Sequence, residues 1–271
     1  MPKTHLLTFL GTGASCGVPS YYCGCPACEE ALRDPRARRD CSSILIQGEE
    51  NTQIDTAPEL RSQYIREGIR KVERVLFTHE HFDHIGGLPQ LEYLVRLQTK
   101  RPLPVYGSAE TLEAIGRRFD FMADVLEGHQ IDLDEELDFD GVRYTPLAAA
   151  HCPGTFGYLI ETGISRCAYF CDSGRLPEPS FSHLREYAQI GQLDYLIIDA
   201  TFNGENWMPA SHHSIDQAID LAQTLGPKHT LLTHLSMHYD TPITLAELEQ
   251  RLADIAGLDI KVAYDGLKIR I

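Results

Sequence analysis

The segment THEHFDHIGG, residues 78–87, constrains this chain more than any other stretch of its sequence. It places His79, His81, Asp83 and His84 within six residues, directly after the strand-like run RVLF. Histidines two residues apart on a loop that leaves a strand can converge on one metal ion, and the aspartate and histidine that follow can turn toward a second. Imidazole and carboxylate suit zinc, and carboxylates extend the choice to manganese or iron. Chance placement does not explain this density of ligands, so the segment predicts a metal centre.

Three more potential ligands follow strand-like runs further along the chain. His151 follows YTPLAAA, Asp172 follows RCAYFC and His234 follows HTLLT. Each of them alone would be an ordinary polar loop residue. Together with the four residues above they make seven ligands, which two ions with one bridging carboxylate would need. Asp55, in IDTAPEL, is predicted instead to orient loops or ligating histidines from behind.

Runs of β-branched and aromatic residues alternate with helical patterns along the chain. Strands are predicted at residues 5–11, 42–47, 52–56, 74–79, 103–107, 143–148, 156–162, 166–172, 195–201, 229–236 and 260–271, the last as a closing hairpin around Asp265-Gly266. Helices are predicted at 58–68, 88–97, 108–119, 179–190, 214–225 and 244–256. Strands are too frequent for one doubly wound sheet, so we expect two mixed sheets packed together with helices outside. Without a linker or repeat, residues 1–271 are predicted to form a single domain.

The charge balance and the cysteine content limit the partners and the compartment. Lysine and arginine number 24 against 39 aspartates and glutamates, a net charge of −15, which disfavours nucleic acid polymers and membrane surfaces. The N-terminal MPKTHLLTFLGTG has too short an apolar run for a signal peptide, and no segment is long enough to span a bilayer. We therefore expect a cytoplasmic protein, in which clustered cysteines more often bind metal than form disulfides.

The H-x-H-x-D-H pattern and the order of the later ligands resemble the metallo-β-lactamase superfamily over essentially the whole chain. The resemblance implies a four-layer αββα sandwich of two mixed sheets flanked by helices, with the metals at one edge of the sheets. It also implies a ligand assignment with Asp172 bridging the two ions. One ion would be held by His79, His81 and His151, and the other by Asp83, His84 and His234. Fold alone does not choose among the many substrates of this superfamily.

The cysteine segment CGCPACEEALRDPRARRDCSS, together with LGTGASCGVPS before it, looks like the branch that contains the PhnP-type phosphoribosyl cyclic phosphodiesterases. In that branch a C-x-C-x-x-C segment binds a separate structural zinc, which implies Cys23, Cys25 and Cys28 as ligands within a zinc loop at about residues 16–41. The fourth ligand is a histidine shortly after the last active-site histidine. His238 is our choice, although Met237 occupies the aligned position. Reduced buried cysteines or a redox pair are the alternatives for this spacing.

The remaining sequence signals concern catalysis and the other cysteines. In ASHHSIDQAIDLA, Ser214 is a predicted helix cap. In the resembled branch a histidine just before this helix reaches the substrate phosphate; His212 aligns best and His213 is adjacent. We predict that Asp83, besides holding a metal ion, is a catalytic residue together with His212 and His213. Four further cysteines in or beside apolar runs are predicted to be core residues: Cys41, Cys152, Cys167 and Cys171.

The resemblance thus implies a phosphodiesterase that opens a small cyclic phosphodiester, first 5-phosphoribosyl 1,2-cyclic phosphate and more weakly a 2′,3′-cyclic nucleotide. Two divalent ions (manganese or zinc, with iron as a third choice) would activate a hydroxide and offset charge on the phosphate. Arg175 and Lys228 are candidates for a distal phosphate, and a homodimer is the default expectation. Three other kinds of relative are disfavoured. A transfer-RNA-processing enzyme is expected to carry a basic stripe and a secreted β-lactamase a signal peptide, and this chain shows neither. The cofactor-synthesis relatives are expected to have a degraded histidine motif, whereas the motif here is intact. Two alternatives stay open, a thioesterase or lactonase of the same fold and a non-catalytic metal-binding protein.

Overall fold

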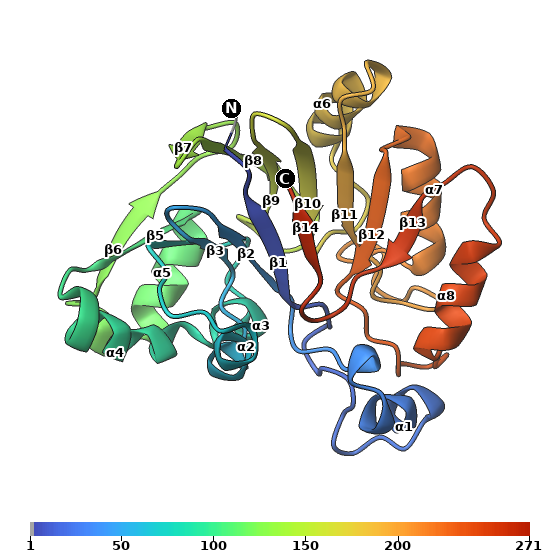
Figure 1. The fold of residues 1–271 in the computed structure, drawn as a ribbon, viewed down its shortest axis with the longest axis horizontal. Coiled ribbons are helices and arrows are strands. Elements are labelled where there is room, and N and C mark those ends of the chain that lie inside the picture. The colour runs from blue at the N-terminus through green and yellow to red at the C-terminus, as the bar shows by residue number, and fades with distance from the viewer. Residues whose placement is uncertain (1–2) are drawn as a thin grey trace.

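The structure, a computed structural model, describes residues 3–271 and contains two seven-stranded sheets packed face to face (Figure 1). The first sheet has the order β14-β1-β2-β3-β4-β5-β6 and the second the order β13-β12-β11-β10-β9-β8-β7. The strands of the first sheet are β1 (Leu6–Gly11), β2 (Ser43–Gln47), β3 (Thr52–Ile54), β4 (Arg74–Leu76), β5 (Leu103–Gly107), β6 (Leu126–Gln130) and β14 (Lys268–Arg270). Those of the second sheet are β7 (Leu137–Phe139), β8 (Val142–Ala148), β9 (Phe156–Glu161), β10 (Arg166–Phe170), β11 (Tyr195–Asp199), β12 (His229–Thr233) and β13 (Ile260–Val262).

Helices cover the outer faces of both sheets. They are α1 (Pro26–Arg33), α2 (Leu60–Glu67), α3 (Phe82–Ile85), α4 (Glu92–Leu94), α5 (Ala109–Arg118), α6 (Glu178–Gln189), α7 (Ile215–Leu225) and α8 (Leu245–Ala253). Buried apolar residues such as Phe9 and Tyr158 fill the space between the sheets. A second core joins the β7–β13 sheet to α6, α7 and α8, and a third joins the other sheet to α2 and α5. The predicted αββα sandwich is therefore confirmed, because each sheet buries one face against the other sheet and one against helices.

The structure corrects the sequence prediction at the C-terminus. Residues 260–271 do not form a hairpin, because β13 pairs in parallel with β12 whereas β14 pairs antiparallel with β1 in the other sheet. Gly266 takes a positive φ of 90° at the turn, and its N–H donates to the carbonyl of Phe9. The turn thus carries the chain from one sheet to the other, and each short strand completes the edge of a different sheet.

Three smaller differences concern regular elements. The predicted helix at 88–97 begins as a 3₁₀ turn at Leu88–Leu91, continues as the single turn α4 and widens at Val95–Thr99. Helix α1 and strands β6 and β7 were not predicted. Strand β6 has little of the alternation that identifies a strand, with mostly exposed residues along LEGHQ.

None of the helices in residues 3–271 is long and apolar enough to cross a membrane.

The order of the strands explains why residues far apart in sequence meet at one end of the sandwich. Strands β10, β11 and β12 run parallel to one another, with Asp199 at the end of β11 opposite Thr233 at the end of β12. Strands β3 and β4 are also parallel, and Ile54 is paired with Leu76. Because parallel strands end at the same edge of a sheet, the loops that follow them emerge together. The residues of these loops form the site described next.

Candidate active site

Three histidines from two loops form the first ligand group. His79 and His81 follow β4, and His151 follows β8. One ring nitrogen of each lies within 4.8 Å of the other two, and Nε2 of His151 is 2.9 Å from Nδ1 of His81. This is the trio that the sequence resemblance assigned to one ion.

The second group combines two carboxylates with two histidines. Asp83 and His84 lie in α3, Asp172 follows β10 and His234 follows β12, and their donor atoms are all within 4.8 Å of one another. Oδ2 of Asp172 is 2.8 Å from Nε2 of His84 and 3.4 Å from Nε2 of His79 in the first group. Asp172 therefore lies between the two groups, as a bridging carboxylate must. We call the two groups together the seven-ligand centre.

Several buried polar atoms of this centre have no hydrogen-bond partner among the described residues. They are the Nε2 atoms of His79, His84 and His234 and Oδ1 of Asp172. A buried polar atom without a partner is costly, and four such atoms within the two ligand groups are explained if cations lie between the ligands. The donor set of imidazoles and carboxylates also suits divalent metals. The residues present thus fit two metal ions.

The opposite nitrogen of most of these rings is held by the protein, which fixes the direction of the ligating nitrogen. Nδ1 of His79 is 3.0 Å from Oγ1 of Thr78, and Nδ1 of His234 is 2.9 Å from Oγ1 of Thr201. Nδ1 of His151 is 2.9 Å from the carbonyl oxygen of Ser211. Nε2 is consequently the nitrogen that each of these three rings presents to the other ligands of the centre.

Asp55 lies behind the centre rather than in it. Its Oδ2 is 2.8 Å from Nδ1 of His84 and accepts a hydrogen bond from Oγ1 of Thr78, and its Oδ1 accepts one from the Thr78 N–H. Asp55 is fully buried and has a positive φ of 60°, and His234 has one of 54°. Such backbone conformations are uncommon outside glycine and often occur at functional sites.

The pKa values of His79 and Asp172 suit metal binding, whereas for His84 the charges of Asp83 and Asp55 outweigh burial and raise the pKa well above its usual range. Burial lowers the pKa of His79 well below its usual range, and the neighbouring His84 lowers it further. Burial alone would raise the pKa of Asp172, but the surrounding histidines, His234 first, hold it well below its usual range. A neutral imidazole and an ionised carboxylate are the forms that ligate divalent ions.

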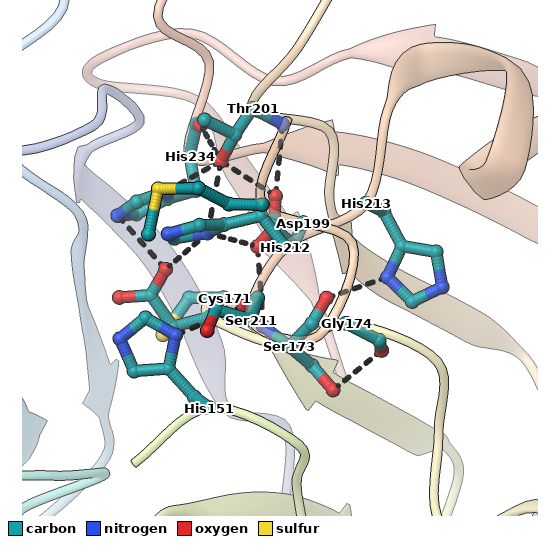
Figure 2. A network of polar contacts seen from close by, with 12 residues as sticks. His151, Cys171, Ser173, Gly174, Asp199, Thr201, Ser211, His212, His213 and His234 are labelled. Carbon is teal, nitrogen blue, oxygen red and sulfur yellow. Dashed lines mark hydrogen bonds and ion pairs between the residues drawn. The ribbon is translucent and has the colours of Figure 1, made fainter. Parts of the chain in front are cut away.

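His212 and His213 are adjacent in sequence, but their side chains occupy different surroundings (Figure 2). The His212 ring stacks on His234 with centroids 5.4 Å apart, and its Nδ1 lies 2.8 Å from Oδ2 of Asp199 and 3.1 Å from Oδ1 of Asp172. Burial lowers the pKa of His212, but the neighbouring carboxylates of Asp172 and Asp199 outweigh it and raise the pKa to about 10. Nδ1 of His213 is instead 2.6 Å from the carbonyl oxygen of Ser173. Only His212 lies beside the seven-ligand centre.

A cavity of about 320 Å³ opens over the centre. Its walls come from the six segments that follow β1, β4, β8, β10, β11 and β12 at the same end of the sandwich. The lining residues are Ala14, Ser15, His81, Asp83, His151, Asp172, Thr201, Phe202, Trp207, Met208, His212, His234 and Tyr239. We call this space the active-site cavity. His213 lines a different cavity, of about 290 Å³, on the surfaces of α6 and α7.

The two residues suggested for a distal phosphate do not reach the active-site cavity. Arg175 lines the cavity that contains His213. Nζ of Lys228 is 2.7 Å from Oδ1 of Asp194, next to the start of β12, whereas His234 follows the end of the same strand. Neither suggested residue therefore lines the active-site cavity, because Arg175, although it follows β10 like Asp172, lies beside α6 and α7, and Lys228 precedes β12 at the opposite end of the strand.

The cysteine segment forms a separate group. Donor atoms of Cys23, Cys28 and His238 lie within 4.8 Å of one another. Cys25 is not part of this group. Burial raises the pKa of Cys28 to about 12, and the nearby thiol of Cys25 contributes to this rise. Sγ of Cys16, a residue not considered from the sequence, is 3.1 Å from Nε2 of His238. Three potential ligands thus lie together outside the active-site cavity, with Cys25 and Cys16 next to them.

The remaining cysteines and Met237 lie in apolar surroundings or loops. Met237 is buried in the core that includes α8, which leaves His238 free to face the thiols. Cys41, Cys167 and Cys171 are buried, whereas Cys152 is half-buried in the loop that carries His151.

A family model described as a beta-lactamase superfamily domain matches residues 50–235, which is more than half of the chain. The chain belongs to the beta-lactamase superfamily. The matched range contains all seven residues of the metal centre together with His212 and Asp199.

Individual superfamily relatives differ in what they do. The chain is 28% identical to an octanoyltransferase of Porphyromonas gingivalis over 96% of its own length, but it spans only 50% of that protein. It is 30% identical to coenzyme PQQ synthesis protein B of Methylobacterium radiotolerans, covering 98% of this chain and 99% of that protein. Among solved structures, a diphosphatase from the PhnP family aligns with a TM-score of 0.85 and 30% identity over 100% of this chain and 98% of the other.

Three features of the site were missed from the sequence. Asp199 ends the strand YLIID, just as Asp172 follows RCAYF, so the criterion that selected Asp172 would have found it. Cys16 lies outside the C-x-C-x-x-C spacing, and nothing in the sequence connects it to His238. The aromatic residues Phe202, Trp207 and Tyr239 carry no motif, and only the fold brings them to one wall.

Proposed function

We propose that this chain is a metal-dependent phosphodiesterase that hydrolyses a small cyclic phosphodiester at the seven-ligand centre. The observation that carries the proposal is the position of His212, which faces the active-site cavity beside the bridging Asp172 and is held from behind by Asp199. A thioester or lactone hydrolase has less need of such a group, because the metals alone can serve a carbonyl substrate with a good leaving group. The PhnP-family relative, a diphosphatase, supports chemistry at phosphorus.

The roles of the residues follow from the balance of the reaction. Hydrolysis forms a P–O bond from water and breaks the P–O bond to the sugar, whose departing oxygen needs a proton. Two bound divalent ions would supply positive charge for the phosphate and lower the pKa of water. The Nδ1 contact with Asp199 leaves Nε2 of His212 directed at the cavity, from which it can donate that proton. Asp83 and Asp172 hold the ions and balance their charge.

We further propose that the ions are zinc or manganese, with iron as a third choice, and that a structural zinc is held by the thiols of the cysteine segment together with His238. The donor sets support this division, because three thiolates and an imidazole suit zinc, whereas the mixed histidine and carboxylate centre accepts several metals. The cysteine segment lies outside the active-site cavity, so its ion would support the fold of the loop rather than the reaction.

The proposal is tested with metal-loaded protein and a panel of substrates. The panel contains 5-phosphoribosyl 1,2-cyclic phosphate, 2′,3′-cyclic nucleotides, a linear diphosphate diester, a bis-aryl phosphodiester, a thioester and a lactone. We expect metal-dependent ring opening of at least one cyclic phosphodiester, faster than hydrolysis of any carbonyl substrate. Turnover of only the thioester or lactone would replace the proposal with the carbonyl alternative, and no metal-dependent turnover of any ester would refute it.

A further inference from the structure

One wall of the active-site cavity is built from aromatic side chains. Phe202 and Trp207 lie in the loop after β11, and Tyr239 lies in the loop after β12. The ring centroids of Phe202 and Trp207 are 4.8 Å apart at an interplanar angle of 67°, and those of Phe202 and Tyr239 are 5.7 Å apart. Tyr239 and Trp207 are 6.1 Å apart, so the three rings form one cluster, which we call the aromatic wall.

The aromatic wall is supported from behind and open in front. Phe202 is buried, whereas Trp207 is 55% exposed although it packs on Phe202. A tryptophan is large and apolar, and leaving more than half of it in water is unfavourable unless something else covers it. A flat aromatic ligand that stacks on the open part of the wall would cover it, and stacking of a base on an aromatic side chain strengthens binding by about tenfold.

The wall lies next to the residue proposed to act on the phosphate. The centroid of the Phe202 ring is 6.0 Å from that of His212, and both residues line the same cavity. A ligand whose phosphate reached His212 would therefore have any ring carried by the same ribose within reach of Trp207. The base and the cyclic phosphate of a nucleoside 2′,3′-cyclic phosphate have this relationship.

The charges of the cavity disfavour a sugar with a second phosphate. Among residues 3–271, the side chains that line the cavity include no lysine or arginine. A distal phosphate would therefore lack the cationic partner that such groups normally receive. The net charge of −15 on the chain does not offset the negative charge of such a phosphate either. A neutral base avoids this cost.

We infer that the active-site cavity binds nucleoside 2′,3′-cyclic phosphates in preference to phosphorylated sugars, with the base stacked on Trp207 of the aromatic wall. The inference rests on the proposed phosphodiesterase function, whose substrate class it narrows. Trp207 acts through binding rather than through the reacting atoms.

Trp207 is the single tryptophan of the chain, so its fluorescence reports directly on the wall. We would titrate metal-loaded protein with adenosine 3′-monophosphate, ribose 5-phosphate, phenyl phosphate and inorganic phosphate, following fluorescence and, in parallel, heat. The adenosine nucleotide should quench Trp207 and bind at least about tenfold more tightly than ribose 5-phosphate, as one stacked base predicts. Equal or tighter binding of ribose 5-phosphate, or no quenching by the nucleotide, would overturn the inference. Tighter binding of phenyl phosphate than of the nucleotide would also overturn the assignment of a base.

Variants separate stacking from a general defect. Trp207→Ala should weaken nucleotide binding in calorimetry about tenfold and leave binding of ribose 5-phosphate unchanged, and Trp207→Phe should restore most of the loss. Tyr93→Ala is the control, because Tyr93 is an exposed aromatic residue of α4 outside the cavity. Equal weakening of both ligands by Trp207→Ala would contradict stacking. Because these experiments measure binding, they stand even if the substrate panel shows no turnover of phosphodiesters, which would refute the proposed function alone.

Discussion

Nδ1 of His212 lies 2.8 Å from Oδ2 of Asp199, at the point where β11 ends. The same carboxylate accepts hydrogen bonds from the Thr201 and Ser173 N–H groups, so its position is fixed by the backbone around it. The imidazole is therefore held in one orientation before any ligand arrives. Preorganised groups of this kind are more effective than mobile ones, because they need no reorganisation during the reaction.

This arrangement gives the first prediction. His212→Ala should lower kcat for a cyclic phosphodiester by about 10²- to 10⁴-fold without changing the metal content, because the departing sugar oxygen loses its proton donor. Asp199→Asn should lower kcat about tenfold with little change in KM, because the amide keeps the shape but not the charge. The loss should be much smaller for a bis-aryl phosphodiester, whose leaving group needs no proton. Steady-state kinetics with both substrates provide the measurement.

His213→Ala is the matched control for His212→Ala. His213 is equally buried but contacts the Ser173 carbonyl and lines the cavity on α6 and α7, so its removal should leave kcat nearly unchanged. If His213→Ala lost as much activity as His212→Ala, or if the loss in His212→Ala were the same for both leaving groups, His212 would not be the proton donor.

The second prediction concerns Asp55, which holds His84 from behind at 2.8 Å. Asp55→Asn removes the charge that orients His84 and Thr78, and we expect metal affinity to fall about 10- to 100-fold. Competition with a chelator followed by metal analysis measures this affinity. Asp265→Asn changes another buried carboxylate away from the centre and should bind metal as the wild type does. An unchanged affinity in Asp55→Asn would remove Asp55 from this role.

The third prediction concerns the proposed structural zinc at the cysteine segment. Cys28→Ser and His238→Ala should each reduce the zinc content by one ion per chain, and Cys167→Ser, in the core strand β10, should not. Cys25→Ser should also lose the ion, because the Cys25 thiol is close to those of Cys23 and Cys28. Cys16→Ser should keep it, because Cys16 contacts the ring of His238 and is expected to support that ligand only. Metal analysis and the thiolate absorption of the cobalt-substituted protein test this. Loss of the ion in Cys16→Ser with retention in Cys25→Ser would make Cys16 the ligand instead.

The cluster of seven potential ligands could be predicted from sequence because four of them form a dense pattern at residues 79–84 and the other three each follow a recognisable strand. The sandwich was predictable for the same reason, since the frequency of strands ruled out one doubly wound sheet. The error at residues 260–271 has a physical cause. The two short runs around Gly266 satisfy the rule for a hairpin, but pairing with β12 and β1 depends on contacts more than 20 residues away in sequence.

Other features could not be read from sequence because they depend on side-chain direction. His212 and His213 are the same residue type at adjacent positions, so the sequence does not separate their roles. The backbone before α7 directs their side chains into two different cavities. The aromatic wall similarly joins Trp207 to Tyr239 across two loops. Arg175 was suggested by residue type alone, which says nothing about the cavity that its side chain lines.

The fourth prediction concerns pH and the turn between the sheets. Asp265 accepts hydrogen bonds from Oγ1 of Thr12 at 2.8 Å and from the Asp40 N–H at 2.7 Å. Burial, with a contribution from the charge of Asp40, raises the pKa of Asp265 to about 7, and these two hydrogen bonds and Arg66 at 3.9 Å only partly offset this. In the unfolded chain an aspartate has a pKa of about 3.9. Between these two values the folded protein holds a proton that the unfolded chain has lost, so the free energy of unfolding must fall as pH rises through this window and become constant above it.

Asp265→Asn isolates this effect, because the amide does not titrate and all other groups are common to both proteins. From pH 5 to pH 8 the wild type should lose about 3 kcal/mol of unfolding free energy relative to Asp265→Asn, since about two pKa units of the shift lie within that range. Denaturant unfolding of both metal-loaded proteins at the two pH values measures the difference. Asp220→Asn, at an exposed position of α7, should follow the wild type. Parallel pH dependence of the wild type and Asp265→Asn would mean that Asp265 is ionised in the folded protein and that its burial is compensated by Arg66 and the Thr12 and Asp40 donors.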